Sequence, residues 1–146
     1  MSKELELFKE LFAPYPNIAI LHINNNLDLV TDSLEEIKDK NEGNIKYIPF
    51  TDESSARLRT AREYEYVVLG DILNYCPNKE AILKLVYKSI ENSGNIIILE
   101  KKSNDNKYEL LDLLEQTGFQ APNNIELFDG FNLLTAKKMH HWDNGL

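Results

Sequence analysis

Strand-like and helix-like segments alternate along most of this chain, and that alternation constrains the fold more than any other feature of the sequence. Four short apolar runs cover residues 18–23, 45–48, 66–69 and 96–99. The last two runs are continuously apolar, which is expected of strands that helices cover on both faces. Strands that alternate with helices predict right-handed crossovers and a mainly parallel sheet.

Apolar residues at helical spacing predict the helices. The stripes cover residues 5–12, 27–37, 82–90 and 108–114, and residues 54–62 form a shorter, polar candidate. The expected boundaries are Pro14 and Pro16 after the first helix, Asn25 or Asn26 before the second, Pro77 and Asn78 before and Ser93 and Gly94 after the third, and Asp105 before and Gly118 after the last.

The end of the chain follows a different pattern. Two apolar runs, 125–128 and 131–136, are separated only by Asp129 and Gly130. Asp-Gly between two such runs is a strong signal for a two-residue hairpin. Because there is no internal repeat and no long linker, we expect one domain over residues 1–146. The predicted class is α/β: a Rossmann-like three-layer sandwich whose mainly parallel sheet ends in a C-terminal antiparallel hairpin.

The composition excludes several classes of protein. Asp and Glu outnumber Lys and Arg by 24 to 16, and the net charge of -8 argues against a non-specific nucleic-acid binder. The single cysteine, Cys76, leaves no intrachain disulfide and no multi-cysteine zinc site, and we expect it to be a packed thiol. No apolar run approaches the length of a membrane span, and residues 1–10 read as an acidic amphipathic segment rather than a signal peptide. We therefore expect a cytoplasmic protein.

The spacing of the glycines excludes the common nucleotide-binding motifs. The six glycines lie far apart, so GxGxxG, GxxxxGK[ST] and the GxSxG nucleophile elbow are all absent. Phosphate-binding loops need glycine because backbone amides must approach the phosphate where a Cβ would collide. An ordinary dinucleotide-binding enzyme and a P-loop NTPase are therefore not expected.

Ligands of open parallel sheets bind beyond the carboxyl ends of the strands, which selects the loops at 22–28, 49–53, 70–76 and 100–104. The first loop contains Asn24, Asn25 and Asn26, which either bind a polar ligand or form a turn that caps the next helix. In the third loop, Asp71 directly follows a buried strand. Its carboxylate either orients or deprotonates a ligand or satisfies the amides of its own loop.

Two further groups of charged residues have both a functional and a structural interpretation. Arg57, Arg59 and Arg62 either bind an acidic substrate or partner or pair with neighbouring glutamates. His140 and His141, with Asp143 nearby, make a poor metal site, because nothing in a terminal segment fixes their geometry. We therefore expect no metal.

Residues 65–78, 81–90 and 93–98 resemble the second half of class I S-adenosylmethionine-dependent methyltransferases. The shared features are a strand that ends in a polar residue, a turn with leucine and proline, a helix, a glycine-containing turn and a very apolar strand. Residues 110–119, which end in Gly-Phe, and the hairpin through Lys137 are similar to the end of that family. The resemblance covers roughly residues 17–138 and is weaker in the first half.

The resemblance implies S-adenosylmethionine as the cofactor and assigns residues to it. His22 stands where the family has an acidic residue, and Asn24 and Asn26 stand where it has glycines and would line the methionine part. Asp52 would hold the ribose. Asp71 and Leu73 would lie near the transferred methyl group or the adenine edge. One strand-helix unit of the full fold is missing between the first strand and residue 66.

Three functions follow from these observations. The first is methyl transfer from S-adenosylmethionine to an unknown substrate, with no catalytic residue assigned. The second is a binding or assembly module that has the methyltransferase fold without its catalysis, and the missing acid and glycines favour it. The third is another small-molecule α/β enzyme. The expected partner is a small molecule or a protein, with no nucleic acid and no membrane, and a homo-oligomer is compatible with the sequence.

Overall fold

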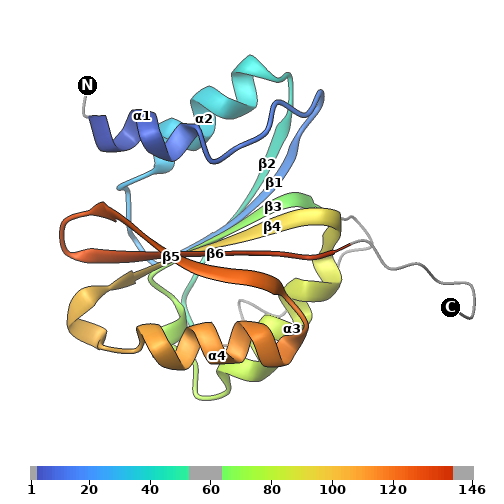
Figure 1. The fold of residues 1–146 in the computed structure, drawn as a ribbon. Coiled ribbons are helices and arrows are strands. Elements are labelled where there is room, and N and C mark those ends of the chain that lie inside the picture. The colour runs from blue at the N-terminus through green and yellow to red at the C-terminus, as the bar shows by residue number, and fades with distance from the viewer. Residues whose placement is uncertain (1–2, 53–63, 140–146) are drawn as a thin grey trace, which may run out of the picture.

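The computed structural model describes residues 3–52 and 64–139, which form a six-stranded sheet with helices on both faces (Figure 1). The strands are β1 (Ala19–Asn24), β2 (Asn44–Pro49), β3 (Tyr64–Gly70), β4 (Ile90–Lys101), β5 (Gln120–Phe128) and β6 (Phe131–Lys137). Their order is β2-β1-β3-β4-β6-β5, in which β2, β1, β3 and β4 are parallel and β6 is antiparallel to both of its neighbours. The predicted α/β class, with a mainly parallel sheet and a C-terminal hairpin, is confirmed.

Among the described residues, four α-helices form the two outer layers: α1 (Lys3–Lys9), α2 (Thr31–Lys40), α3 (Lys79–Ser89) and α4 (Lys107–Thr117). In Figure 1, α1 and α2 cover one face of the sheet, and α3 and α4 cover the other. Alternate residues of each strand point to opposite faces. Ile20 of β1 accordingly packs in the core beneath α1 and α2, and Leu21 packs in the core beneath α3 and α4.

Burial of the strands follows their place in the sheet. All six residues of β1 are buried, because helices cover both faces of this central strand. Strand β2 lies at the edge of the sheet, and most of its residues are exposed, including Tyr47. The carboxyl-terminal residues of β1 and β3 are thus buried, and their packing holds the loops that follow them in place.

Several predicted boundaries agree with the structure. The Asn78 side chain caps α3 by accepting a hydrogen bond from the Ala81 amide at 3.0 Å. Gly118 ends α4 with a φ of 118°, in the left-handed region that glycine adopts readily. Gly130, with a φ of 82°, turns the hairpin between Phe128 and Phe131. Cys76 is 2% exposed and packs in the core.

Three predicted boundaries are wrong by about one helical turn. Helix α1 ends at Lys9 rather than at Pro14, because the Leu11 and Phe12 amides donate to carbonyl oxygens three residues back, as in a tighter turn. Helix α2 begins at Thr31 rather than at an Asn25 or Asn26 cap, because the Asn24 side chain donates to the Leu27 carbonyl oxygen at 2.7 Å and stabilises a turn there. Helix α3 ends at Ser89 rather than at Ser93 and Gly94, because Ile90 already pairs with Tyr64 of β3. A side-chain hydrogen bond before α2 and strand pairing after α3 thus override the helical pattern of the sequence.

The predicted helix at 54–62 with Arg57, Arg59 and Arg62, and the terminal group of His140, His141 and Asp143, lie outside the described residues. Within the described segments, no three His, Cys, Asp or Glu side chains gather in a way that would hold a metal ion. None of the helices in those segments is both long enough and apolar enough to cross a membrane.

Candidate functional site

The carboxyl ends of β1 and β3 form the topological switch point of the sheet. After β1 the chain continues to β2 on one side, and after β3 it continues to β4 on the opposite side. The two connections therefore diverge, and open α/β sheets bind their ligands in the crevice at such a point. Asn24 at the end of β1 lies beside Gly70 at the end of β3. The crevice expected at this switch point is the region beyond these two residues.

The Asn24 side chain fills the space above Gly70. Asn24 is only 4% exposed, and a Cβ added to Gly70 would collide with its Oδ1 atom. Its Nδ2 atom donates to the Leu27 carbonyl oxygen at 2.7 Å and lies 3.4 Å from the Tyr47 hydroxyl oxygen. The asparagine is thus packed within the protein, against β2, β3 and the turn that follows β1, and is not directed towards solvent.

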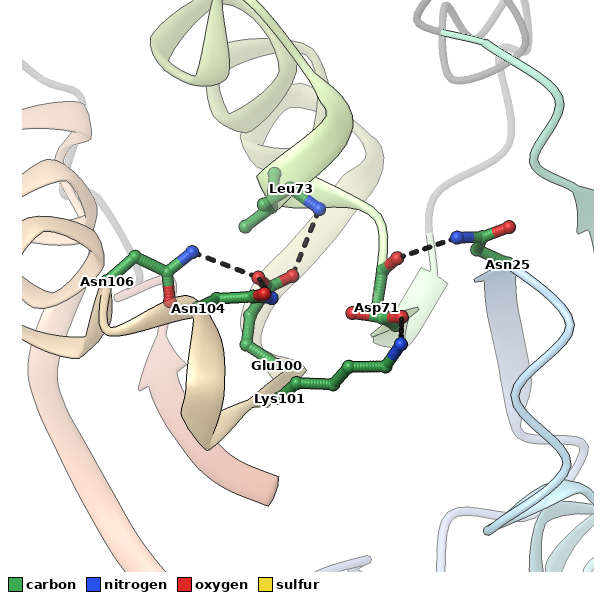
Figure 2. A network of polar contacts seen from close by, with 7 residues as sticks. All are labelled: Asn25, Asp71, Leu73, Glu100, Lys101, Asn104 and Asn106. Carbon is green, nitrogen blue, oxygen red and sulfur yellow. Dashed lines mark hydrogen bonds and ion pairs between the residues drawn. The ribbon is translucent and has the colours of Figure 1, made fainter. Parts of the chain in front are cut away.

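Asn25 joins the two sides of the crevice (Figure 2). Its backbone amide donates to the Gly70 carbonyl oxygen at 2.9 Å, and its side-chain Nδ2 donates to the Asp71 carbonyl oxygen at 3.3 Å. Asn26 is exposed and has a φ of 53°, the left-handed conformation that asparagine tolerates well. The turn without glycine therefore exists, and its middle residue is tied to β3.

Asp71 lies at the rim of the crevice in a constrained geometry. Its φ is 58°, and it is only 3% exposed. Burial raises the pKa of its carboxyl group, and the nearby Lys101 ammonium opposes that shift. The Lys101 Nζ atom lies 3.7 Å from Asp71 Oδ2, as Figure 2 shows. The Oδ2 atom of the carboxylate is thus paired within the protein, whereas its Oδ1 atom is buried without a hydrogen-bond partner.

Glu100, at the end of β4, organises the other side of the rim. Its Oε2 atom accepts a hydrogen bond from the Leu73 amide at 3.0 Å. Its Oε1 atom accepts from the side chains of Asn104 at 3.1 Å and Asn106 at 3.0 Å (Figure 2). Burial at 1% exposure raises the pKa of this carboxyl group, although the asparagine hydrogen bonds oppose the shift. Glu100 thereby ties the loops after β3 and β4 and the start of α4 together.

His22 is a buried, neutral side chain. It is 2% exposed and packs edge-on against Tyr47, with 5.3 Å between ring centroids. Burial lowers the pKa of its imidazole to about 4, because desolvation disfavours the charged form. At neutral pH it carries no charge, so this position supplies no ionic group to a ligand.

No family model and no curated protein sequence matches this chain, but solved structures do. A SAM-dependent methyltransferase from Aquifex aeolicus is 10% identical and matches with a TM-score of 0.70 over 94% of this chain and 90% of that chain. Haemonchus contortus phosphoethanolamine N-methyltransferase 2, in complex with S-adenosyl-L-methionine, is 9% identical, with a TM-score of 0.71 over 94% of this chain and 52% of that chain. A putative methyltransferase in complex with the Haloferax volcanii Trm112 methyltransferase activator is 8% identical, with a TM-score of 0.68 over 97% and 91%.

The fold is that of class I S-adenosylmethionine-dependent methyltransferases. The identities are so low that the likeness extends to the fold alone, and the chain spans about half the length of the Haemonchus methyltransferase. Within the described residues, a single strand, β2, lies between β1 and β3 along the chain.

The structure brings only some of the predicted site residues together. Asn24, Asn26 and Asp71 lie around the crevice at the ends of β1 and β3. Asp52 is exposed in the segment that follows β2, and the Leu73 side chain is fully buried in the core beneath α3 and α4. Contact between these residues and a cofactor stays a prediction.

Sequence reasoning missed two residues of the site. Glu100 and Lys101 make contacts that join one loop to the next. The rule that ligands bind at strand ends had selected the loop at 100–104, but only the fold reveals which groups its side chains meet. No sequence motif identifies these contacts.

A sulfonium cofactor at the switch point needs open space above the ends of β1 and β3 and polar groups that face it. Here the Asn24 side chain fills the space above Gly70, and Asn25 bridges to the Asp71 backbone. The Asp71 carboxylate is paired with Lys101. The described residues at the ends of β1 and β3 thus contact one another through side chains as well as through the backbone.

Proposed function

We propose that this chain is a binding or assembly module that has the methyltransferase fold without methyl transfer. The observation that carries the proposal is the crevice filled by the protein's own groups: Asn24 over Gly70, and Asn25 bonded to the backbone of Asp71. Methyl transfer depends on holding the sulfonium and the nucleophile in line, which requires a cradle for the cofactor. Side chains that occupy the cradle leave no room for the cofactor, so the chain lacks what methyl transfer requires.

Two other observations support a non-catalytic role. The buried and neutral His22 cannot provide the negative charge that the family has at this position. One structural neighbour is a putative methyltransferase in complex with an activator protein, so at least one protein of this fold binds a protein partner, as an assembly role requires. A retained fold with an occupied crevice is consistent with such a role.

Methyl transfer is the competing function, and the neighbours that use or hold S-adenosylmethionine favour it. In that case Asp71 would orient or deprotonate the substrate, and Asp52 would hold the ribose hydroxyls. The crevice would then have to open, with Asn25 released from Asp71. The two functions therefore differ in whether the chain as it stands binds the cofactor.

Calorimetric titration with S-adenosylmethionine and S-adenosylhomocysteine separates them. The natural chain is expected to give no heat and no thermal shift at millimolar ligand. A variant with Asn24→Gly, Asn25→Gly and Asn26→Gly removes the side chains from the crevice and is expected to gain binding. Asn17→Gly is the matched control, because Asn17 is also exposed and left-handed, with a φ of 58°, but precedes β1.

Micromolar binding by the natural chain that is lost on Asp52→Ala would overturn the proposal in favour of methyl transfer. If neither chain binds, the non-catalytic role stands and the asparagine side chains are not what excludes the cofactor. Thermal unfolding of each variant establishes that it is folded before its titration is interpreted.

A further inference from the structure

A groove of about 620 Å³ lies between α1 and α2, in the layer that covers one face of the sheet. Phe12, Pro14 and Ile37 form its apolar lining. Phe12 and Ile37 are almost fully buried and form the bottom of the groove, its floor. Pro14 is exposed. The groove therefore offers apolar surface to a partner at the bottom of an open channel.

The rim of the groove is acidic. Glu6, Glu10, Glu36 and Asp39 line it, against two lysines, Lys9 and Lys40. Lys9 is already held by Glu6 at 3.0 Å and by Glu36 at 2.9 Å, and these hydrogen bonds raise the pKa of its ammonium group. Asp39 lies 3.5 Å from the Lys38 Nζ atom, and its side chain stays largely exposed to a partner. The carboxyl-terminal end of α2, where partial negative charge gathers, adds to the field of the carboxylates.

The groove is separate from the crevice. At the end of α2, the Asn41 carbonyl oxygen accepts a hydrogen bond from the Asn17 amide at 2.8 Å, and Asn17 precedes the start of β1. The crevice lies at the other end of that strand. An interaction in the groove therefore leaves the crevice unobstructed, whatever the crevice binds.

We propose that this groove docks a basic amphipathic helix of a partner protein. Apolar side chains of that helix contact Phe12 and Ile37, and its lysines or arginines face Glu10 and Asp39. Amphipathic helices bind protein grooves in this way, with an apolar face in the groove and charged residues along the rim. Packing between two neighbouring helices also provides the ridges and grooves that a third helix requires.

Charge complementarity selects this occupant over a second copy of the chain. Each copy carries a net charge of -8, and an acidic rim repels another acidic surface. A basic segment is instead attracted to the acidic rim as it approaches, and its apolar side chains contact the floor of the groove once it is bound. The proposal goes beyond the proposed function and does not depend on it, because it uses a different surface.

Fluorescence anisotropy with a labelled synthetic peptide tests the proposal. The probe carries leucines at helical spacing on one face and lysines on the other. A scrambled peptide of the same composition has the same charge without the apolar face. The full chain is expected to bind the amphipathic probe at least about tenfold more tightly than the scrambled one, because only the former can bury its leucines against the floor.

A pair of charge reversals then locates the contact. Glu10→Lys with Asp39→Lys is expected to weaken binding of the amphipathic peptide by at least about tenfold. The matched control, Asp112→Lys with Glu115→Lys, makes the same change in net charge on exposed positions of α4, across the sheet, and is expected to change affinity by less than about twofold. Circular dichroism establishes that both double variants are folded.

Equal weakening by the two pairs, equal affinity for the two peptides, or no binding at all would each overturn the proposal. The triple glycine variant of the crevice is expected to bind the peptide as the natural chain does. Failure of the peptide experiment thus leaves the cofactor titration unaffected, and the two proposals fail separately.

Discussion

Gly70→Ala is the perturbation that tests the geometry of the crevice most directly. A Cβ at this position would collide with Asn24 Oδ1 and lie 3.1 Å from Asn24 Cγ, so the asparagine side chain must move. Overpacking of this kind costs about 1–3 kcal/mol. Displacing Asn24 also breaks its hydrogen bond to the Leu27 carbonyl oxygen, which contributes about 1 kcal/mol. Together these effects predict a loss of about 2–4 kcal/mol in the free energy of unfolding.

A double-mutant cycle isolates the cause. Asn24→Gly removes the side chain that an alanine at position 70 would meet, so Gly70→Ala should cost little in that background. Gly70 does not have a positive φ, and alanine suits such a backbone. The coupling energy between the two substitutions is therefore expected to be about 1–3 kcal/mol, with the double variant more stable than the sum of the single effects implies.

Urea unfolding followed by circular dichroism measures all four proteins of the cycle. The midpoints should shift while the slope stays constant, which identifies a change in stability. Gly43→Ala serves as the control partner for Asn24→Gly, because its Cβ would meet Ile18 at the opposite end of β1 and the two effects should add. Additive effects of Gly70→Ala and Asn24→Gly would refute the packing of Asn24 over Gly70, and with it the argument that the crevice is filled.

Two further predictions concern the buried titratable groups. Glu100→Gln leaves one acceptor oxygen for three donors and is expected to destabilise the chain by about 1–3 kcal/mol in urea unfolding at neutral pH. Burial raises the pKa of Glu100 in the folded chain above 4.5. The stability that this shift contributes is fully present below pH 4.5 and is lost as the pH rises through the pKa of the folded chain. The glutamine variant should not show this loss. His22 has a folded pKa of about 4 against 6.5 when unfolded, so about 3 kcal/mol of stability should disappear as pH falls from 6.5 to 4. His22→Leu should remove that dependence, and an unchanged acid profile would show that His22 is not responsible for it.

The sequence by itself determined the architecture. Continuous apolar runs at 66–69 and 96–99 specify strands covered on both faces, and the Asp-Gly pair at 129–130 specifies the hairpin. Asn78 and Gly118 likewise mark helix ends, because capping depends on local hydrogen bonds and on backbone conformation. These signals depend only on residues that are close together in the sequence, so the sequence alone is enough to reveal them.

The tertiary structure alone decided what the crevice contains. The sequence left open whether its three asparagines bind a ligand or form a turn, since the outcome depends on Gly70 and Asp71, which lie more than forty residues further along the chain. The hydrogen bonds of Glu100 and the groove between α1 and α2 likewise join segments that are distant in sequence. Long-range packing sets which polar groups meet, and the spacing of residues along a single chain does not specify it.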